Sequence, residues 1–280
     1  MIALLGNVFS PYYAARRRQG PAEPLDHCAM NVAYYGPGGP LWALTERDRG
    51  SVERTGSRLR IAESVAKVDD DGGLTFHLCE RTSPFAKYLR GTVRVEPGTV
   101  GSNEFALDDA GRHRWTPLRL NARATVQLEH PFRTAWTGRA YVDTNDGDEP
   151  LERGFRSWDW SRTSGDDLTH VVYDVTRADG SASSVRRTFR RDGTHVPLSG
   201  VEAFEVGKTR WGVGRRVPSD VGTKPRVCRS LEDTPFYART LSTARFGGQP
   251  VHLVHETVDL QRFDRRWVQF LIPFRMRRVA

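Results

Sequence analysis

Short segments in which apolar and polar residues alternate recur along the whole chain, bounded by Gly, Pro, Asn and Asp. Alternation with a period of two is typical of strands, whereas the spacing of an amphipathic helix is nearly absent. The clearest segments are residues 74–78, 91–95, 124–128, 169–175, 184–189 and 251–260. The pattern predicts an all-β chain of antiparallel strands arranged as a sandwich or barrel.

Turn signals separate these segments, for example Asp71-Gly72-Gly73, Asp179-Gly180 and Asp192-Gly193. Residues 143–153 are rich in acidic residues, Gly and Pro, and they divide the strand-like segments into two sets. We therefore expect two β domains, residues 1–150 and residues 151–280. No repeat of fixed period stands out, which argues against a solenoid or propeller.

The net charge of +8 over 280 residues would suit an anionic partner, either a lipid surface or nucleic acid. Only Lys67, Lys87, Lys208 and Lys224 are lysines, so the excess is arginine, and a GC-rich genome explains such a bias equally well. The basic residues are dispersed and no recognition module is visible. No nucleic-acid partner is expected.

No apolar run approaches the roughly 20 residues that a membrane-spanning helix needs, and the first residues are too short and uncharged for a secretory signal. A cytoplasmic location is expected. Cys28, Cys79 and Cys228 are far apart and odd in number, which favours reduced thiols over a disulfide framework or a paired-cysteine zinc motif.

The motifs of several common catalytic and binding sites are absent from the chain. The chain has no Gly-x-Ser-x-Gly elbow and no phosphate-binding loop. His252 and His255 are three apart on an expected strand, so their side chains face opposite sides and cannot share a metal ion. The acidic run 143–149 is similar to a calcium loop, but its glycine comes one position early. The sequence thus shows no metal-binding motif of workable spacing.

Aromatic and acidic residues gather around the expected domain boundary. On pattern alone they form either the wall of an aromatic pocket that contains one or two carboxylates, or ordinary core tryptophans beside solvated turn acids. The second interpretation is the more common outcome for such a pattern. The residues are His113, Trp115, Trp136, Tyr141, Asp143, Trp158, Asp159 and Trp160.

Longer strings change this balance, because together they resemble the bacterial carotenoid 1,2-hydratase (hydroxyneurosporene synthase) family over nearly the whole chain. Their length and order make them far more specific than any single motif. They are residues 8–13, Asn31-Val32-Ala33 with Tyr35-Gly36, residues 42–47, 111–115, Tyr141-Val142-Asp143 with Asn145, residues 147–152, Phe155-Arg156, residues 158–162, 231–239 and 273–276.

The resemblance implies two lipocalin-like β domains, the first of which carries the catalytic residues. It also implies an acyclic carotenoid substrate such as neurosporene or lycopene, hydrated at C1 with a proton added to C2, and no metal or organic cofactor. Members of the family usually carry a further stretch, rich in Gly, Trp and Tyr, upstream of the position of Met1. Two explanations are open, a mis-assigned start and a real truncation, and in the second case an edge strand of the first domain would be missing.

Protonating an isolated alkene requires a strong acid, and a carboxyl group kept neutral by an apolar site is suited to this. By its position, Asp143 matches the family's catalytic aspartate and is assigned as general acid. Trp115 and Tyr141 match positions suited to stabilising the cation, and His113 is proposed to orient the water. The expected substrate-binding residues are Trp136, Trp158 and Trp160.

Residues 267–274 are apolar and flanked by arginines, as in segments that contact a membrane peripherally. A terminal element packed on the barrel would have the same pattern. Three other functions remain open: a non-catalytic carrier of carotenoids or other terpenoids, an isomerase and a cyclase. The sequence leaves the oligomeric state undetermined.

Overall fold

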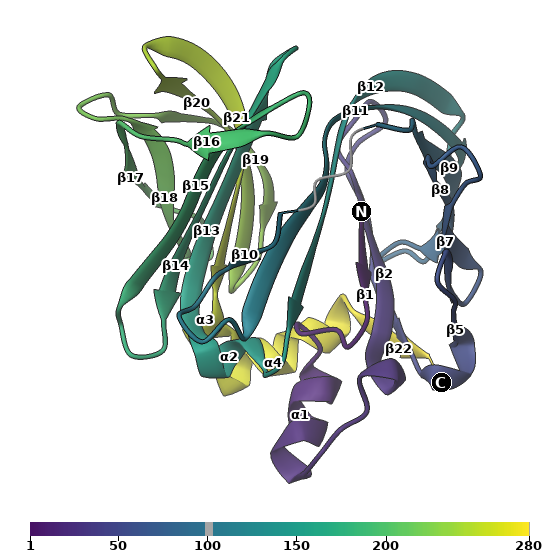
Figure 1. Cartoon of the computed structure of the whole chain (residues 1–280). Coiled ribbons are helices and arrows are strands. Elements are labelled where there is room, and N and C mark those ends of the chain that lie inside the picture. The colour runs from purple at the N-terminus through teal and green to yellow at the C-terminus, as the bar shows by residue number, and fades with distance from the viewer. Residues whose placement is uncertain (99–102, 280) are drawn as a thin grey trace. The chain divides into compact units, whose positions relative to one another are not determined.

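The computed structural model describes residues 1–98 and 103–279, and it confirms the predicted antiparallel β architecture (Figure 1). The chain forms two compact units. The first consists of Met1–Gly98, Ala122–Ala140 and Gln269–Ala280, and the second of Thr99–Asn121 and Tyr141–Val268. Residue 150, where the sequence suggested a boundary, lies inside the second unit.

The first unit contains a small sheet in which β2 pairs with β1, β3 and β4, and β22 runs parallel to β4. Further strands follow one another in the antiparallel order β9-β8-β7-β6-β5, and the second half of β11 pairs with β9. The bounds are β1 (Ile2–Leu4), β2 (Cys28–Tyr34), β3 (Leu41–Ala43), β4 (Thr45–Arg47), β5 (Val52–Arg54), β6 (Arg58–Ile61), β7 (Ser64–Val68), β8 (Leu74–Arg81), β9 (Tyr88–Val95), β11 (His113–His130) and β22 (Arg277–Val279).

The second unit is built on a seven-stranded antiparallel sheet in the order β16-β15-β14-β13-β21-β20-β19. A hairpin of β17 and β18 accompanies it, and β10 pairs with the first half of β11. The bounds are β10 (Phe105–Ala106), β12 (Thr134–Gly147), β13 (Phe155–Ser164), β14 (Leu168–Arg177), β15 (Ala182–Arg190), β16 (His195–Pro197), β17 (Val201–Lys208), β18 (Gly214–Asp220), β19 (Arg226–Asp233), β20 (Tyr237–Phe246) and β21 (Gln249–Asp259).

The two faces of β13 carry different side chains because successive residues of a strand point to opposite sides. Asp159 and Ser161 are buried on one face, whereas Trp160 and Arg162 project from the other and remain partly accessible. In β21 the same rule leaves His252 exposed and buries His255 completely. The prediction that these two histidines face opposite sides is confirmed.

Short helices connect the strands, and the sequence analysis did not predict them. In α1 (Pro11–Gln19) the Ser10 hydroxyl accepts a hydrogen bond from the Tyr13 amide, and proline occupies the first turn, both common at helix starts. The other helices are α2 (Leu151–Gly154), α3 (Leu260–Phe263) and α4 (Arg266–Leu271), with 3₁₀ turns η1 (Pro24–His27), η2 (Arg49–Ser51) and η3 (Ile272–Phe274). Within residues 1–98 and 103–279, none of the helices has the length and apolar character required to span a membrane.

Candidate active site

Asp143 lies on β12 and receives two hydrogen bonds on the same carboxyl oxygen. The indole Nε1–H of Trp115 donates to Oδ2 over 2.8 Å, and the hydroxyl of Tyr141 donates to Oδ2 over 3.0 Å. Tyr141 precedes Asp143 by two residues, so both side chains project from one face of the strand. All three residues belong to the second unit.

Trp115 is held rigidly, because its side chain is completely buried. The rings of Phe105, Tyr173 and Phe189 surround it at centroid distances of 5.3, 6.2 and 6.2 Å. A buried indole N–H needs an acceptor, and here the acceptor is Asp143. This geometry favours a role in positioning the carboxyl group rather than direct contact with a substrate.

The environment of Asp143 stabilises its neutral form. Burial raises the pKa of the Asp143 carboxyl group above its ordinary value, and the hydrogen bonds from Trp115 and Tyr141 offset only part of that rise. The carboxylate of Glu256 raises the pKa further, whereas the guanidinium of Arg162 lowers it. A carboxyl group with a raised pKa is suited to general acid catalysis near neutral pH.

The other carboxyl oxygen of Asp143, Oδ1, accepts no hydrogen bond from the residues that the structure describes. Because Oδ2 already accepts two hydrogen bonds, the proton of the neutral acid resides on Oδ1. The side chain keeps some accessible surface. Asp143 can therefore donate a proton from Oδ1 without breaking either bond that holds it.

His113 shares a face of β11 with Trp115, as predicted, but has different neighbours. Its ring lies 4.5 Å from that of Phe155, and its Nε2 lies 3.6 Å from Glu149 Oε1. A Cβ added at Gly147 would come within 2.6 Å of His113 Nδ1, so the backbone of β12 packs directly on the ring. Within the described parts of the chain, both ring nitrogens are buried without a hydrogen-bond partner, and Asp143 is not among the residues that His113 contacts.

Comparison with known proteins identifies the family. A family model described as carotenoid hydratase CrtC matches residues 1–280. The chain belongs to the carotenoid hydratase family. The resemblance inferred from the sequence strings is thereby confirmed.

Curated relatives in this family are named acyclic carotenoid 1,2-hydratase. The protein of Thiocapsa roseopersicina is 41% identical over 290 residues, which cover 100% of this chain and 69% of the relative. The protein of Rubrivivax gelatinosus is 38% identical, with 100% and 69% covered, and that of Cereibacter sphaeroides is 35% identical, with 94% and 92% covered.

Solved structures share the fold of this hydratase family member at low sequence identity. A structure named as an AttH candidate from Nitrosomonas europaea superposes with a TM-score of 0.55 at 14% identity, covering 82% of this chain and 85% of the other. A structure of CghA with Sch210972 gives a TM-score of 0.50 at 11% identity, with 84% of each chain covered. These likenesses support the lipocalin-like fold.

The three tryptophans expected to bind a carotenoid occupy different surroundings. Trp160 lies on β13 with its ring 5.6 Å from that of Tyr141, and it is partly accessible. Trp158 projects from the same face of β13, two residues earlier. Trp136 belongs to the first unit, is 42% exposed and contacts Tyr34. Within the second unit, the geometry thus joins Trp160 to the group around Asp143.

The sequence analysis missed two charged residues of this candidate site. The Arg162 guanidinium carbon lies 4.8 Å from the centroid of the Tyr141 ring. Glu256 lies opposite Trp160 in the pairing of β13 with β21, and Arg239 Nε donates to its Oε1 over 2.9 Å. The available signal was the spacing Trp158-x-Trp160-x-Arg162, which places an arginine on the same strand face as two tryptophans.

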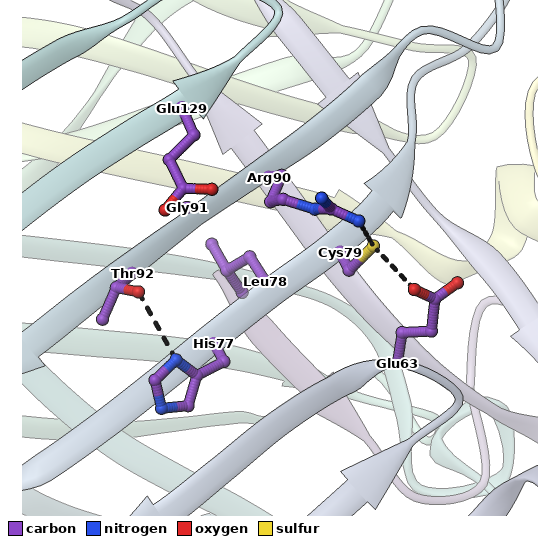
Figure 2. A pocket seen from close by; sticks show the side chains of 8 residues that line it. All are labelled: Glu63, His77, Leu78, Cys79, Arg90, Gly91, Thr92 and Glu129. Atoms are coloured by element: carbon purple, nitrogen blue, oxygen red, sulfur yellow. Dashed lines mark hydrogen bonds between the residues drawn. The ribbon is translucent and has the colours of Figure 1, made fainter.

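Figure 2 shows a surface pocket of the first unit, lined by Glu63, His77, Leu78, Cys79, Arg90, Gly91, Thr92 and Glu129. In it Arg90 donates to the Cys79 sulfur, which in turn contacts Glu63 Oε2 at 3.2 Å. The lining is mostly polar and has no Phe, Tyr or Trp side chain, unlike the surroundings of Asp143. No group of three or more His, Cys, Asp or Glu side chains suited to a metal ion occurs among residues 1–98 and 103–279.

Proposed function

We propose that this protein hydrates the terminal C1–C2 double bond of acyclic carotenoids, such as lycopene and neurosporene, by acid catalysis with Asp143 as the proton donor. The names of the family relatives support the reaction class. The observation that carries the proposal for this chain is the geometry of Asp143, held through Oδ2 by Trp115 and Tyr141 with Oδ1 unbonded among the described residues.

The proposed reaction balances with water as the only co-reactant. The proton on Asp143 Oδ1 moves to C2, where the π electron pair forms the new C–H bond and leaves a tertiary cation at C1. The oxygen of a water molecule bonds to C1, and the proton it loses returns to the Asp143 carboxylate. The product is a 1-hydroxy carotenoid, and the acid is regenerated.

The cation needs electron-rich neighbours that do not react with it. The partly accessible rings of Tyr141 and Trp160 suit this task, since an aromatic face contributes about 2 kcal/mol or more to a desolvated cation. We assign His113 to hold the water, because its buried ring nitrogens need partners that the described protein groups do not supply. Full activity of a His113→Ala variant would contradict this assignment.

The test is expression in cells that accumulate lycopene or neurosporene, followed by chromatography and mass spectrometry for products heavier by one water. Asp143→Asn should abolish the product. Asp148→Asn is the matched control, because the Asp148 side chain is 64% exposed and bound by Arg114, whose hydrogen bond lowers the Asp148 pKa. Unchanged carotenoid with a folded parent protein would refute the hydratase and favour a carrier.

Proton transfer and addition of water need no redox partner and no Lewis acid in this scheme, so we propose a cofactor-free enzyme. Dialysis against a chelator should leave the rate unchanged. A rate that falls and recovers when one metal is restored would refute this part of the proposal.

We also propose peripheral contact with a membrane through the C-terminal segment. Phe270 and Phe274 are 69% and 68% exposed, their rings lie 5.5 Å apart, and Arg275 follows directly. Exposed aromatics beside arginines suit the interface of an anionic bilayer. A truncation would remove Met276, which is buried, so substitutions of the exposed phenylalanines are the cleaner test.

Flotation with anionic liposomes should bring up the parent protein and much less of a Phe270→Ser/Phe274→Ser double variant. Val221→Ser is the matched control, because Val221 is 66% exposed but lies on the connection between β18 and β19. Equal flotation of the parent and the double variant would refute the docking proposal.

A further inference from the structure

Arg162 is a partly accessible cation that forms no ion pair with the residues that the structure describes. It projects from β13, and within the described part of the chain its only hydrogen bond runs from Nη1 to Ser164 Oγ over 2.8 Å. The Nε atom is buried and has no partner among these residues. Burial lowers the pKa of the guanidinium, although arginine remains charged in proteins.

Partial desolvation of an unpaired charge is costly, so a group that carries negative charge at some stage of the reaction is expected near Arg162. The guanidinium carbon lies 4.8 Å from the centre of the Tyr141 ring, and the hydroxyl of that ring donates to Asp143 Oδ2 over 3.0 Å. Arg162 thus stacks on the residue that holds the general acid.

We propose that Arg162 is a positioning residue that fixes the Tyr141 ring and supplies the positive charge that stabilises the Asp143 carboxylate after its proton has moved to the alkene. The inference rests on the proposed function, because it gives the guanidinium a partner that exists only during turnover. It also means that one face of Tyr141 is occupied by Arg162, which leaves the other face and Trp160 for the substrate cation.

Several charged or titratable groups act on Asp143, and each comes from a different strand or face. Neutralising Glu256 should lower the Asp143 pKa, because the Glu256 carboxylate disfavours a second negative charge. Neutralising Arg162 should raise the Asp143 pKa, because the guanidinium favours the carboxylate. The groups are Tyr141 on β12, Arg162 on β13, and Glu256 on β21 with its partner Arg239 on β20. Tyr173 on β14 also lies near them, but burial and the charge of Asp143 raise its pKa far above the ordinary value, so it stays neutral and adds no charge.

The experiment compares purified parent, Arg162→Met and Arg162→Lys proteins in carotenoid hydration across pH. Arg162→Met should shift the alkaline limb of the kcat–pH profile to higher pH by about one unit, because Asp143 then stays protonated to higher pH. The plateau value of kcat should fall by about tenfold or more, because the carboxylate product of proton transfer is less stable. Arg162→Lys should leave the limb near its parental position. A purely structural residue would lower the plateau without moving the limb.

A second readout does not depend on activity. The carbonyl stretch of protonated Asp143, assigned by its absence in Asp143→Asn, can be titrated by infrared difference spectroscopy. It should persist to higher pH in Arg162→Met and disappear at lower pH in Glu256→Gln. Arg162→Gln, which also removes the charge, keeps the test decisive if Arg162→Met does not fold, and it should shift the titration in the same direction.

These experiments distinguish failure of the inference about Arg162 from failure of the proposed hydratase function. A carboxyl titration that is the same in the parent and in the variants overturns the inference, even if the protein hydrates carotenoids. Shifted titrations in a protein that leaves lycopene and neurosporene unchanged support the coupling of Arg162 to Asp143 and refute the hydratase function instead.

Discussion

Removing the Tyr141 hydroxyl tests whether the Asp143 pKa is set by the two hydrogen bonds on Oδ2. Tyr141→Phe deletes one oxygen atom and keeps the ring that contacts Trp160 and Arg162. The lost interaction is the 3.0 Å bond from the phenol to Asp143 Oδ2, while the 2.8 Å bond from Trp115 remains. The variant therefore changes the electrostatics of the acid with little change in packing.

The size of the expected shift in the Asp143 pKa follows from the charge on the hydrogen-bond acceptor. A hydrogen bond to a charged group contributes about 1.5–3 kcal/mol, against about 0.5–1.5 kcal/mol for a neutral pair. The difference favours the carboxylate by about 1.4 kcal/mol, which corresponds to roughly one pH unit. Losing the bond raises the Asp143 pKa, so the alkaline limb of kcat should move upward by about one unit. The plateau should fall by about threefold to tenfold, because a weaker acid protonates carbon more slowly.

The assay measures initial rates of hydration by purified protein with lycopene in detergent micelles, from acidic to alkaline pH. Tyr173→Phe is the matched control, because the Tyr173 hydroxyl donates to Asn145 Oδ1 over 3.3 Å rather than to Asp143. Its alkaline limb should coincide with that of the parent. A Tyr141→Phe limb that stays in place or moves downward would refute the reasoning, as would an equal shift in both variants.

Two further predictions concern stability. Burial raises the pKa of the Glu80 carboxyl group to about 7 from an ordinary value of 4.5. The neutral carboxyl group therefore contributes fully to stability below pH 4.5, and this contribution is lost as the pH rises through 7 and the buried group becomes charged. Glu80→Gln should therefore stabilise the protein by roughly 3 kcal/mol at neutral pH and by much less in acid, measured by urea unfolding, and a difference that does not depend on pH would contradict this. Gly147→Ala should destabilise the protein by about 1–3 kcal/mol, because the new Cβ would meet the buried His113 ring at 2.6 Å. Gly138→Ala is the control and should unfold like the parent, because no atom lies within 4 Å of the new Cβ. An equal loss of stability in both alanine variants would show that the destabilisation comes from replacing glycine in the strand and not from the contact with His113.

Local periodicity was enough to predict the segments with the clearest alternation as strands, because a period of two depends only on neighbouring residues. Residues 74–78 and 184–189 lie within β8 and β15, and the last residue of the segment 251–260 begins α3 instead of extending β21. The helix α1 was missed, although Ser10-Pro11 is a common helix start, because the following residues include three successive arginines rather than an apolar stripe. The residues that make up each compact unit could not be predicted from the sequence, because β11 and β12 each contribute residues to both units.

The candidate site was predictable only where the family strings reached it. Trp115, Tyr141 and Asp143 do meet, because the β11–β12 pairing brings together residues that are 28 positions apart. Arg162 lies within the string 158–162 and Glu256 lies outside the strings, but both come from other strands than Asp143, and only the tertiary fold places their charges near the acid. Burial was also not readable from the sequence, and the complete burial of Trp115 was therefore not predicted.

The two donors on Oδ2 also explain why Asp143→Asn and Asp143→Ala should differ. An asparagine can place its amide oxygen at the Oδ2 position, so Trp115 and Tyr141 keep their acceptor while the acidic proton is lost. An alanine removes the acceptor and leaves the completely buried indole N–H unpaired, at a cost of about 1–3 kcal/mol. Thermal unfolding should therefore show the Asp143→Asn variant close to the parent and the Asp143→Ala variant clearly less stable, with both inactive. Equal stability of the two variants would mean that the indole N–H finds another partner, and the assignment of Trp115 as the residue that positions Asp143 would then fail.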